Sequence, residues 1–209
     1  VGTFALPEAV IVDNRFLSTL PERQVLSGFA EMLKHALLAG ERQLAEIMDV
    51  DLSQVAGEDF LPLIRESVEV KSAIVQGDFR EKGLRKALNL GHTVGHAIES
   101  VAIRKDLDIY HGDAVAYGLV AELYLSVQKK GFDEKHYEAV RKFILEKYPE
   151  YHPVDTPDNL YELMSHDKKN EREGVNFTLL RCPGEVETDQ YCRREEILEA
   201  LEQIPCRCI

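Results

Sequence analysis

Two histidines in the stretch ALNLGHTVGHAIES are the residues best placed to do chemistry. His92 and His96 lie four positions apart, and side chains at that spacing project from the same side of a helix, one turn apart. The same stripe, continued at helical spacing, takes in Arg85, Asn89 and Glu99. Imidazole nitrogens bind metals and move protons. The spacing therefore leaves open two metal ligands, two substrate contacts, one of each, or buried histidines with satisfied hydrogen bonds.

Two other segments offer ligands from different helices. His111 stands directly before a predicted helix, followed two residues later by Asp113, an acid that could orient its other ring nitrogen; a surface histidine is the simpler interpretation. Glu31, Lys34 and His35 interrupt an apolar helix, which is costly unless they are paired or coordinated. The alternative there is a helix salt bridge. Glu and His ligands with one open position make a catalytic zinc site, but spacing cannot choose among seven histidines.

Composition and charge exclude several classes of function. The 209 residues include 37 acidic and 25 basic ones, for a net charge of −12, which disfavours binding to nucleic acid or to an anionic membrane surface. Four cysteines form no C-x-x-C pair, so free thiols in a reducing cytoplasm are expected. No apolar run is long enough for a transmembrane helix, and the stretch VGTFALPEAVIVD lacks the basic start and the small-residue cleavage site expected of a secretory signal.

The elements that must position these residues are mostly helices. Residues 9–13, AVIVD, predict one buried strand. Ser27 is the predicted N-cap of the first helix, and Gly40 its end. The other helices and the two short strands are expected in this order along the chain: helices over 58–78, 83–101, 112–131, 133–148 and 158–166, strands over 174–180 and 184–191, and a helix over 194–204. The prediction is a mainly α domain with a small late β element.

Two glycines lie inside a predicted helix. Gly91 and Gly95 each cost about 1 kcal/mol relative to alanine inside a helix, which is tolerable where a neighbouring helix or a ligand comes close to the backbone.

No G-x-G-x-x-G motif and no Walker loop occurs. If the protein uses a dinucleotide, the domain that binds it is expected to lie outside this chain.

Four segments together carry a family resemblance. LPERQVLSGFAEMLKHALL, EKGLRKALNLGHTVGHAIES, HGDAVAYG and HDKKNEREGVNFTLL, in this order, closely resemble the C-terminal half of 3-dehydroquinate synthase, up to about Leu180. The resemblance implies a two-domain enzyme, with an N-terminal Rossmann-like domain that binds NAD⁺ and a C-terminal helical domain. Residues 1–18 then correspond to a terminal strand and link from the NAD⁺ domain, and residues 19–209 to the metal- and substrate-binding domain.

Functional residues follow from the resemblance position by position. The positions for the ligands of a Zn²⁺ or Co²⁺ ion are Glu31, His92 and His111. The positions that bind substrate are Lys34, Lys71, Arg85, Asn89, His96 and Lys168, with Lys169 as the fallback. Of these, His96, Lys34, Lys71 and Arg85 are expected to take part in catalysis, and Glu81 matches an acid beside the site. The family usually has H-G-E where this chain has Asp113, so the orientation of His111 could differ slightly.

The resemblance also implies the reaction. A heptulosonate phosphate, 3-deoxy-D-arabino-heptulosonate 7-phosphate, would become 3-dehydroquinate and phosphate in the shikimate pathway, in a cytoplasmic homodimer. This chain alone is expected to keep the fold without catalysing the reaction. The alternatives are another sugar-phosphate cyclase, a metal-dependent glycerol or alcohol dehydrogenase, and a non-catalytic zinc-binding helical domain.

Overall fold

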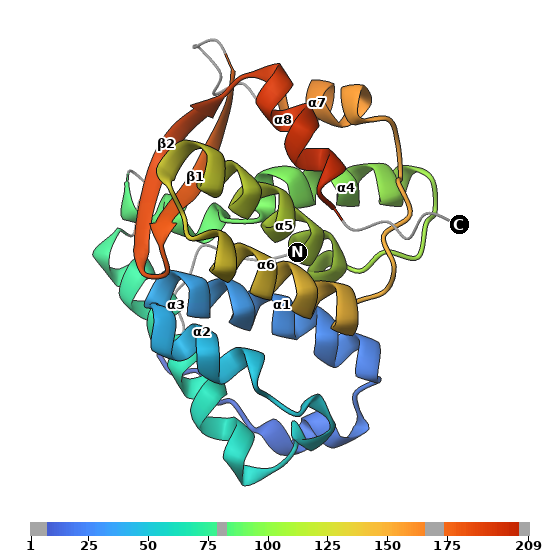
Figure 1. The fold of residues 1–209 in the computed structure, drawn as a ribbon. Coiled ribbons are helices and arrows are strands. Elements are labelled where there is room, and N and C mark those ends of the chain that lie inside the picture. Colours follow the sequence, from blue (N-terminus) through green and yellow to red (C-terminus); the bar gives the residue numbers. More distant parts are fainter. Residues whose placement is uncertain (1–7, 79–82, 166–173, 205–209) are drawn as a thin grey trace.

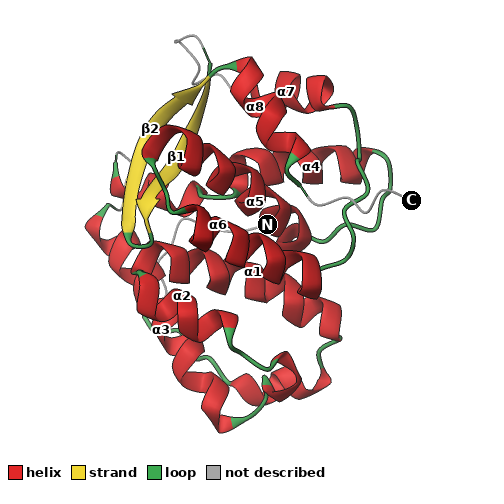
Figure 2. Ribbon diagram, viewed as in Figure 1, coloured by secondary structure: helices red, strands yellow, loops and turns green. Residues whose placement is uncertain are grey.

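The computed structural model describes residues 8–78, 83–165 and 174–204, and it confirms a mainly α domain with one small β element (Figures 1 and 2). The α-helices are α1 (Glu22–Ala39), α2 (Glu41–Met48), α3 (Leu61–Gly77), α4 (His92–Arg104), α5 (His111–Lys130), α6 (Glu134–Lys147), α7 (Pro157–Ser165) and α8 (Arg194–Glu202). The strands β1 (Val175–Cys182) and β2 (Glu185–Cys192) pair as an antiparallel hairpin. Short 3₁₀ helices cover Asn14–Thr19, Leu52–Gln54, Glu58–Phe60 and, as η4, Leu84–Asn89.

Helix α5 runs through the centre of the molecule (Figure 1). Apolar residues surround it almost completely, and a helix of that kind belongs in a core. Leu119 and Leu123 pack into one hydrophobic cluster with residues of α1, α2, α3 and α6. Tyr117, Ala121 and Leu125 pack into a second cluster with residues of α4, α7, α8 and the hairpin. The first residue of α5 is thereby held on the most buried element of the fold.

Glycines let α5 approach its neighbours at backbone distance. A Cβ placed on Gly118 would come within 2.0 Å of the Gly91 carbonyl oxygen, and one on Gly112 within 2.0 Å of the Ser27 carbonyl oxygen. Gly91 also has a φ of +78°, a conformation that favours glycine. The glycine preceding α4 thus admits a neighbouring helix, one of the two possibilities that the sequence offered.

Two expectations about local structure are wrong, and one helix was not predicted. Residues 9–13 form no strand, and Val10 and Ile11 are 75% and 92% exposed, because the described residues place no partner strand beside them. Ser27 does not cap α1, which already begins at Glu22; instead Ser27 Oγ accepts a hydrogen bond from the Gly112 N–H. Helix α2 was not predicted as a separate element.

The stripe from residue 85 to residue 99 does not lie on one helix. The 3₁₀ helix η4 ends at Asn89, and α4 starts only after the left-handed Gly91. The start of η4 is held by Asp78 Oδ2, which accepts from the Gly83 and Arg85 backbone N–H groups. The left-handed backbone at Gly91 therefore divides a segment whose hydrophobic spacing predicts one continuous helix.

The β-hairpin packs against η4 and holds it in place. Thr178 Oγ1 donates to the Lys86 carbonyl at 2.8 Å, and Lys86 Nζ forms an ion pair with Asp189 at 2.7 Å. The late β element thus supports the segment that leads into His92. Within the described residues, no helix is both long enough and apolar enough to cross a membrane.

Candidate metal centre

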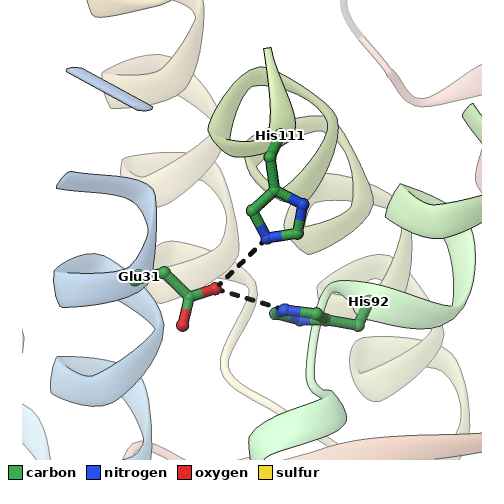
Figure 3. Close-up of side chains that lie close together, drawn as sticks. All are labelled: Glu31, His92 and His111. Atoms are coloured by element: carbon green, nitrogen blue, oxygen red, sulfur yellow. Dashed lines mark ion pairs between the residues drawn. The ribbon is translucent and has the colours of Figure 1, made fainter. Parts of the chain in front are cut away.

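Three side chains from three helices converge on one point (Figure 3). Glu31 projects from the middle of α1, while His92 and His111 are the first residues of α4 and α5. Glu31 Oε1 lies 3.2 Å from His92 Nε2 and 3.9 Å from His111 Nε2. One ligand atom from each of the three residues falls within 4.8 Å of the other two. The structure thus brings together the three residues predicted as metal ligands.

Each histidine is oriented through its other ring nitrogen. His92 Nδ1 lies 3.1 Å from the Leu90 carbonyl oxygen, and His111 Nδ1 lies 3.2 Å from Glu99 Oε1. A neutral ring that donates from Nδ1 presents a bare lone pair at Nε2. Both Nε2 atoms then face a Glu31 oxygen that is buried and has no hydrogen-bond donor in the described part of the chain. Converging lone pairs of this kind are suited to a cation between them, and two imidazoles with a carboxylate suit zinc.

Glu31 is poised as a carboxylate. Burial acts to raise its pKa, but Lys34, through its charge and its hydrogen bond, helps to hold the pKa below its usual range. Lys34 Nζ lies 2.8 Å from Glu31 Oε2 and 3.0 Å from the Leu88 carbonyl. Burial lowers the pKa of Lys34, whose side chain is 3% exposed, and the charge of Glu31 partly offsets that effect. The helix salt bridge considered for this pair is therefore present, and it leaves Glu31 Oε1 for the shared point.

His96 lies beside the three converging residues. Its ring centre is 5.1 Å from that of His92 and 6.2 Å from that of His111. The side chain is exposed, yet partial desolvation and the neighbouring His92 lower the pKa of His96. At neutral pH it is thus a neutral imidazole, open to solvent next to the candidate metal position.

The other predicted substrate residues that the structure describes lie on α3 and η4. Lys71 is exposed on α3, and its charge helps to lower the pKa of Lys34. Arg85 is partly buried and Asn89 is exposed, both on η4, the segment that leads into His92. The predicted residues that lie outside the described part of the chain are Glu81, Lys168 and Lys169.

Asp113 does not orient His111, contrary to the expectation from its position. Its Oδ2 accepts from Arg23 at 2.9 Å and from the Tyr110 backbone N–H at 3.1 Å, and the side chain is fully buried. Asp113 therefore fixes the first turn of α5, and Glu99 orients the His111 ring. Sequence spacing placed Glu99 on the polar stripe, but only the fold shows which residue it meets.

A buried acid was missed altogether. Glu122 is 0% exposed on α5; burial acts to raise its pKa, and the backbone N–H groups at the start of α4 oppose that effect because they bind the carboxylate form. Its signal in the sequence was a lone charge in the apolar run AVAYGLVAELYLSV, since a charged residue in a fully buried helix is rare unless it is paired.

Known proteins are similar to this chain in sequence. A family model described as 3-dehydroquinate synthase C-terminal matches residues 28–170. A 3-dehydroquinate synthase of Parabacteroides distasonis is 45% identical over 203 residues, which are 97% of this chain and 58% of that protein. One from Leptospira interrogans is 39% identical over 209 residues, 97% of this chain and 56% of that protein. The chain thus spans little more than half the length of these relatives.

Solved structures agree on the architecture. A 2-epi-5-epi-valiolone synthase from Streptomyces hygroscopicus, with NAD⁺ and Zn²⁺ bound, has a TM-score of 0.75 at 25% identity, covering 90% of this chain and 53% of that one. A 2-deoxy-scyllo-inosose synthase has a TM-score of 0.73 at 24% identity, covering 97% of this chain and 57% of that one, and supports the fold alone. The family match over residues 28–170 and the near-complete coverage by close relatives show that this chain belongs to the 3-dehydroquinate synthase family.

Proposed function

We propose that this chain is the metal- and substrate-binding part of a 3-dehydroquinate synthase, which converts 3-deoxy-D-arabino-heptulosonate 7-phosphate to 3-dehydroquinate and phosphate. The observation that carries the proposal is the convergence of Glu31 Oε1, His92 Nε2 and His111 Nε2. The relatives named 3-dehydroquinate synthase support it. Residues outside this chain would hold most of the NAD⁺, and the homodimer and the cytoplasmic location implied by the resemblance stay predictions.

Glu31, His92 and His111 would hold the divalent cation, Zn²⁺ or Co²⁺. A cation held there supplies Lewis-acid polarisation of a substrate hydroxyl, and NAD⁺ supplies the reversible hydride exchange. His92 would keep donating from Nδ1 to the Leu90 carbonyl, and His111 from Nδ1 to the Glu99 carboxylate. Lys34 would hold Glu31 Oε2 and so keep Oε1 directed at the cation.

The remaining residues would handle the two anionic groups and the protons of the substrate. Lys71, whose charge acts on Lys34, and Arg85 on η4 are cationic and suit a phosphate or a carboxylate, and Asn89 on η4 offers amide hydrogen bonds. His96 at neutral pH can accept a proton at a ring nitrogen, beside the cation position. Lys168, outside the described residues, is proposed as a further phosphate or carboxylate contact.

An activity assay tests this proposal. It uses a protein as long as the relatives, so that the part proposed to bind NAD⁺ is present. Purified protein with Zn²⁺, NAD⁺ and the heptulosonate phosphate should release inorganic phosphate and form 3-dehydroquinate, both measured against time. His92→Ala should abolish release, whereas His152→Ala, at an exposed position far along the chain, should leave it intact.

The products separate the alternatives. Turnover of a different sugar phosphate to another carbocycle would indicate a different cyclase. Oxidation of glycerol or a simple alcohol without phosphate release would indicate a dehydrogenase. Zinc binding without turnover of any sugar phosphate would indicate a non-catalytic zinc-binding domain.

A further inference from the structure

A carboxylate in the core caps the helix that starts with His92. Glu122 Oε2 accepts from the Gly91 N–H at 2.6 Å, and Glu122 Oε1 accepts from the Val94 N–H at 3.1 Å. Helix α4 has no side-chain cap of its own, because the residue at its N-cap position is Gly91. The first N–H groups of a helix lack intrahelical partners, so buried ones need an acceptor from elsewhere. Glu122 supplies that acceptor from α5.

The cap coincides with the closest contact between the two helices. Gly118 lies one turn before Glu122 on α5 and meets the carbonyl oxygen of Gly91. The glycine contact sets how closely α4 approaches α5. The two hydrogen bonds fix the first turn of α4 in its rotation about the helix axis and in its position along that axis. His92 stands between the two backbone N–H groups that Glu122 binds. His111 begins the same helix that carries Glu122.

We propose that Glu122 is a positioning residue that holds the His92 ring at the separation from His111 required by a shared cation. This inference rests on the metal-binding function proposed above. Glu122 acts through the backbone on either side of His92. Its carboxylate offers two acceptor atoms to two N–H donors at the positive end of a helix. An amide at this position offers one acceptor and turns its own N–H groups towards a second donor.

Zinc affinity tests the proposal on the 209-residue chain, by competition with a chromophoric chelator. Glu122→Ala should bind Zn²⁺ about 10- to 100-fold more weakly than wild type, the range found when groups supporting metal ligands are removed. Glu122→Gln should fall between the two. Ser126→Ala is the matched control: its Oγ is buried one turn later on α5 and bonds to the Glu122 carbonyl and the Leu180 N–H. It should leave zinc affinity within about twofold of wild type.

A second measurement separates positioning from general stability. Co²⁺ bound in place of zinc reports coordination geometry through its visible absorption bands. The bands should shift in Glu122→Gln and stay unchanged in Ser126→Ala. If Glu122→Ala does not fold, the glutamine variant decides the question.

The possible outcomes are distinct. Glu122 variants with wild-type affinity and unchanged cobalt bands would overturn the inference, as would losses no larger than those of Ser126→Ala. A wild-type chain that binds no zinc would instead refute the proposed metal site, and the inference with it.

Discussion

His111 Nδ1 lies 3.2 Å from Glu99 Oε1, so an acid in the middle of one helix orients a histidine at the start of another. Such a carboxylate fixes the ring and its tautomer and raises the basicity of the nitrogen that faces the metal. Glu99 belongs to α4, the helix that also carries His92. The orientation of both proposed histidine ligands therefore depends on the placement of α4.

Replacement of Glu99 should weaken metal binding, and more so when the hydrogen-bond acceptor is removed than when only the charge is removed. Glu99→Ala deletes the acceptor and should reduce zinc affinity about 10-fold or more. Glu99→Gln keeps an oxygen that accepts from Nδ1 but loses the charge, so a smaller loss is expected. Ser100→Ala, at the next and exposed position, serves as the control. Titration with a zinc chelator measures all three, and equal affinities would contradict the assigned role.

The two histidines of the LGHTVGH segment should differ in what they control. His92→Ala removes one of three converging ligand atoms and should leave the purified chain with little bound zinc by metal analysis. His96→Ala should retain a stoichiometry near that of wild type, because its ring lies beside the ligand atoms and outside the converging set. In the full-length protein His96→Ala should still lower turnover. Loss of zinc from both variants to the same extent would show that the division is wrong.

The crossing of α4 and α5 predicts a large effect from one methyl group. Gly118→Ala places a Cβ 2.0 Å from the Gly91 carbonyl oxygen, so the helices must separate, at a cost of about 1–3 kcal/mol in the free energy of unfolding. Gly28→Ala on α1 meets no atom within 4 Å and should stabilise the chain by up to about 1 kcal/mol. Urea unfolding measures both. A neutral Gly118→Ala would contradict the close crossing.

His35 should make the stability of the chain depend on pH. It is 4% exposed, and its Nδ1 lies 2.8 Å from Ser67 Oγ. Burial and the charge of Lys34 lower its pKa to about 4. The native ring is neutral, whereas the unfolded ring takes up a proton near pH 6.5. The contribution of the neutral ring is complete above pH 6.5 and is lost as pH falls towards 4, by about 2 kcal/mol between pH 7 and pH 5.

His35→Gln tests this in urea unfolding with EDTA present. The variant should lose less stability than wild type on acidification, by about the same 2 kcal/mol. His152→Gln, at an exposed site, should follow the wild-type curve. Parallel curves for wild type and His35→Gln would show that His35 is not held neutral by the fold.

Much of the helical architecture could be read from the sequence. Apolar spacing predicted α5 and α6 to within one residue at each end, as helices over 112–131 and 133–148, because this signal acts within a few residues of the chain. The same local physics misplaced the start of α1 at Ser27 and joined η4 to α4. Ser27 Oγ accepts from the distant Gly112 N–H, and the Leu88 carbonyl accepts from Lys34 Nζ. In each case the partner is a distant residue and not one in the next turn of the predicted helix.

The candidate site divides in the same way. Residue type and spacing placed His92 and His96 on one side of a segment, and the family resemblance marked Glu31 and His111 as their companions. Which atom faces which was decided by tertiary structure, since Glu99 reaches His111 and Glu122 reaches Gly91 from a different helix in each case. Periodicity records only which side of its own helix a residue occupies. The partner across the gap depends on how closely two backbones cross, and at Gly91 and Gly118 that crossing exists only in the folded chain.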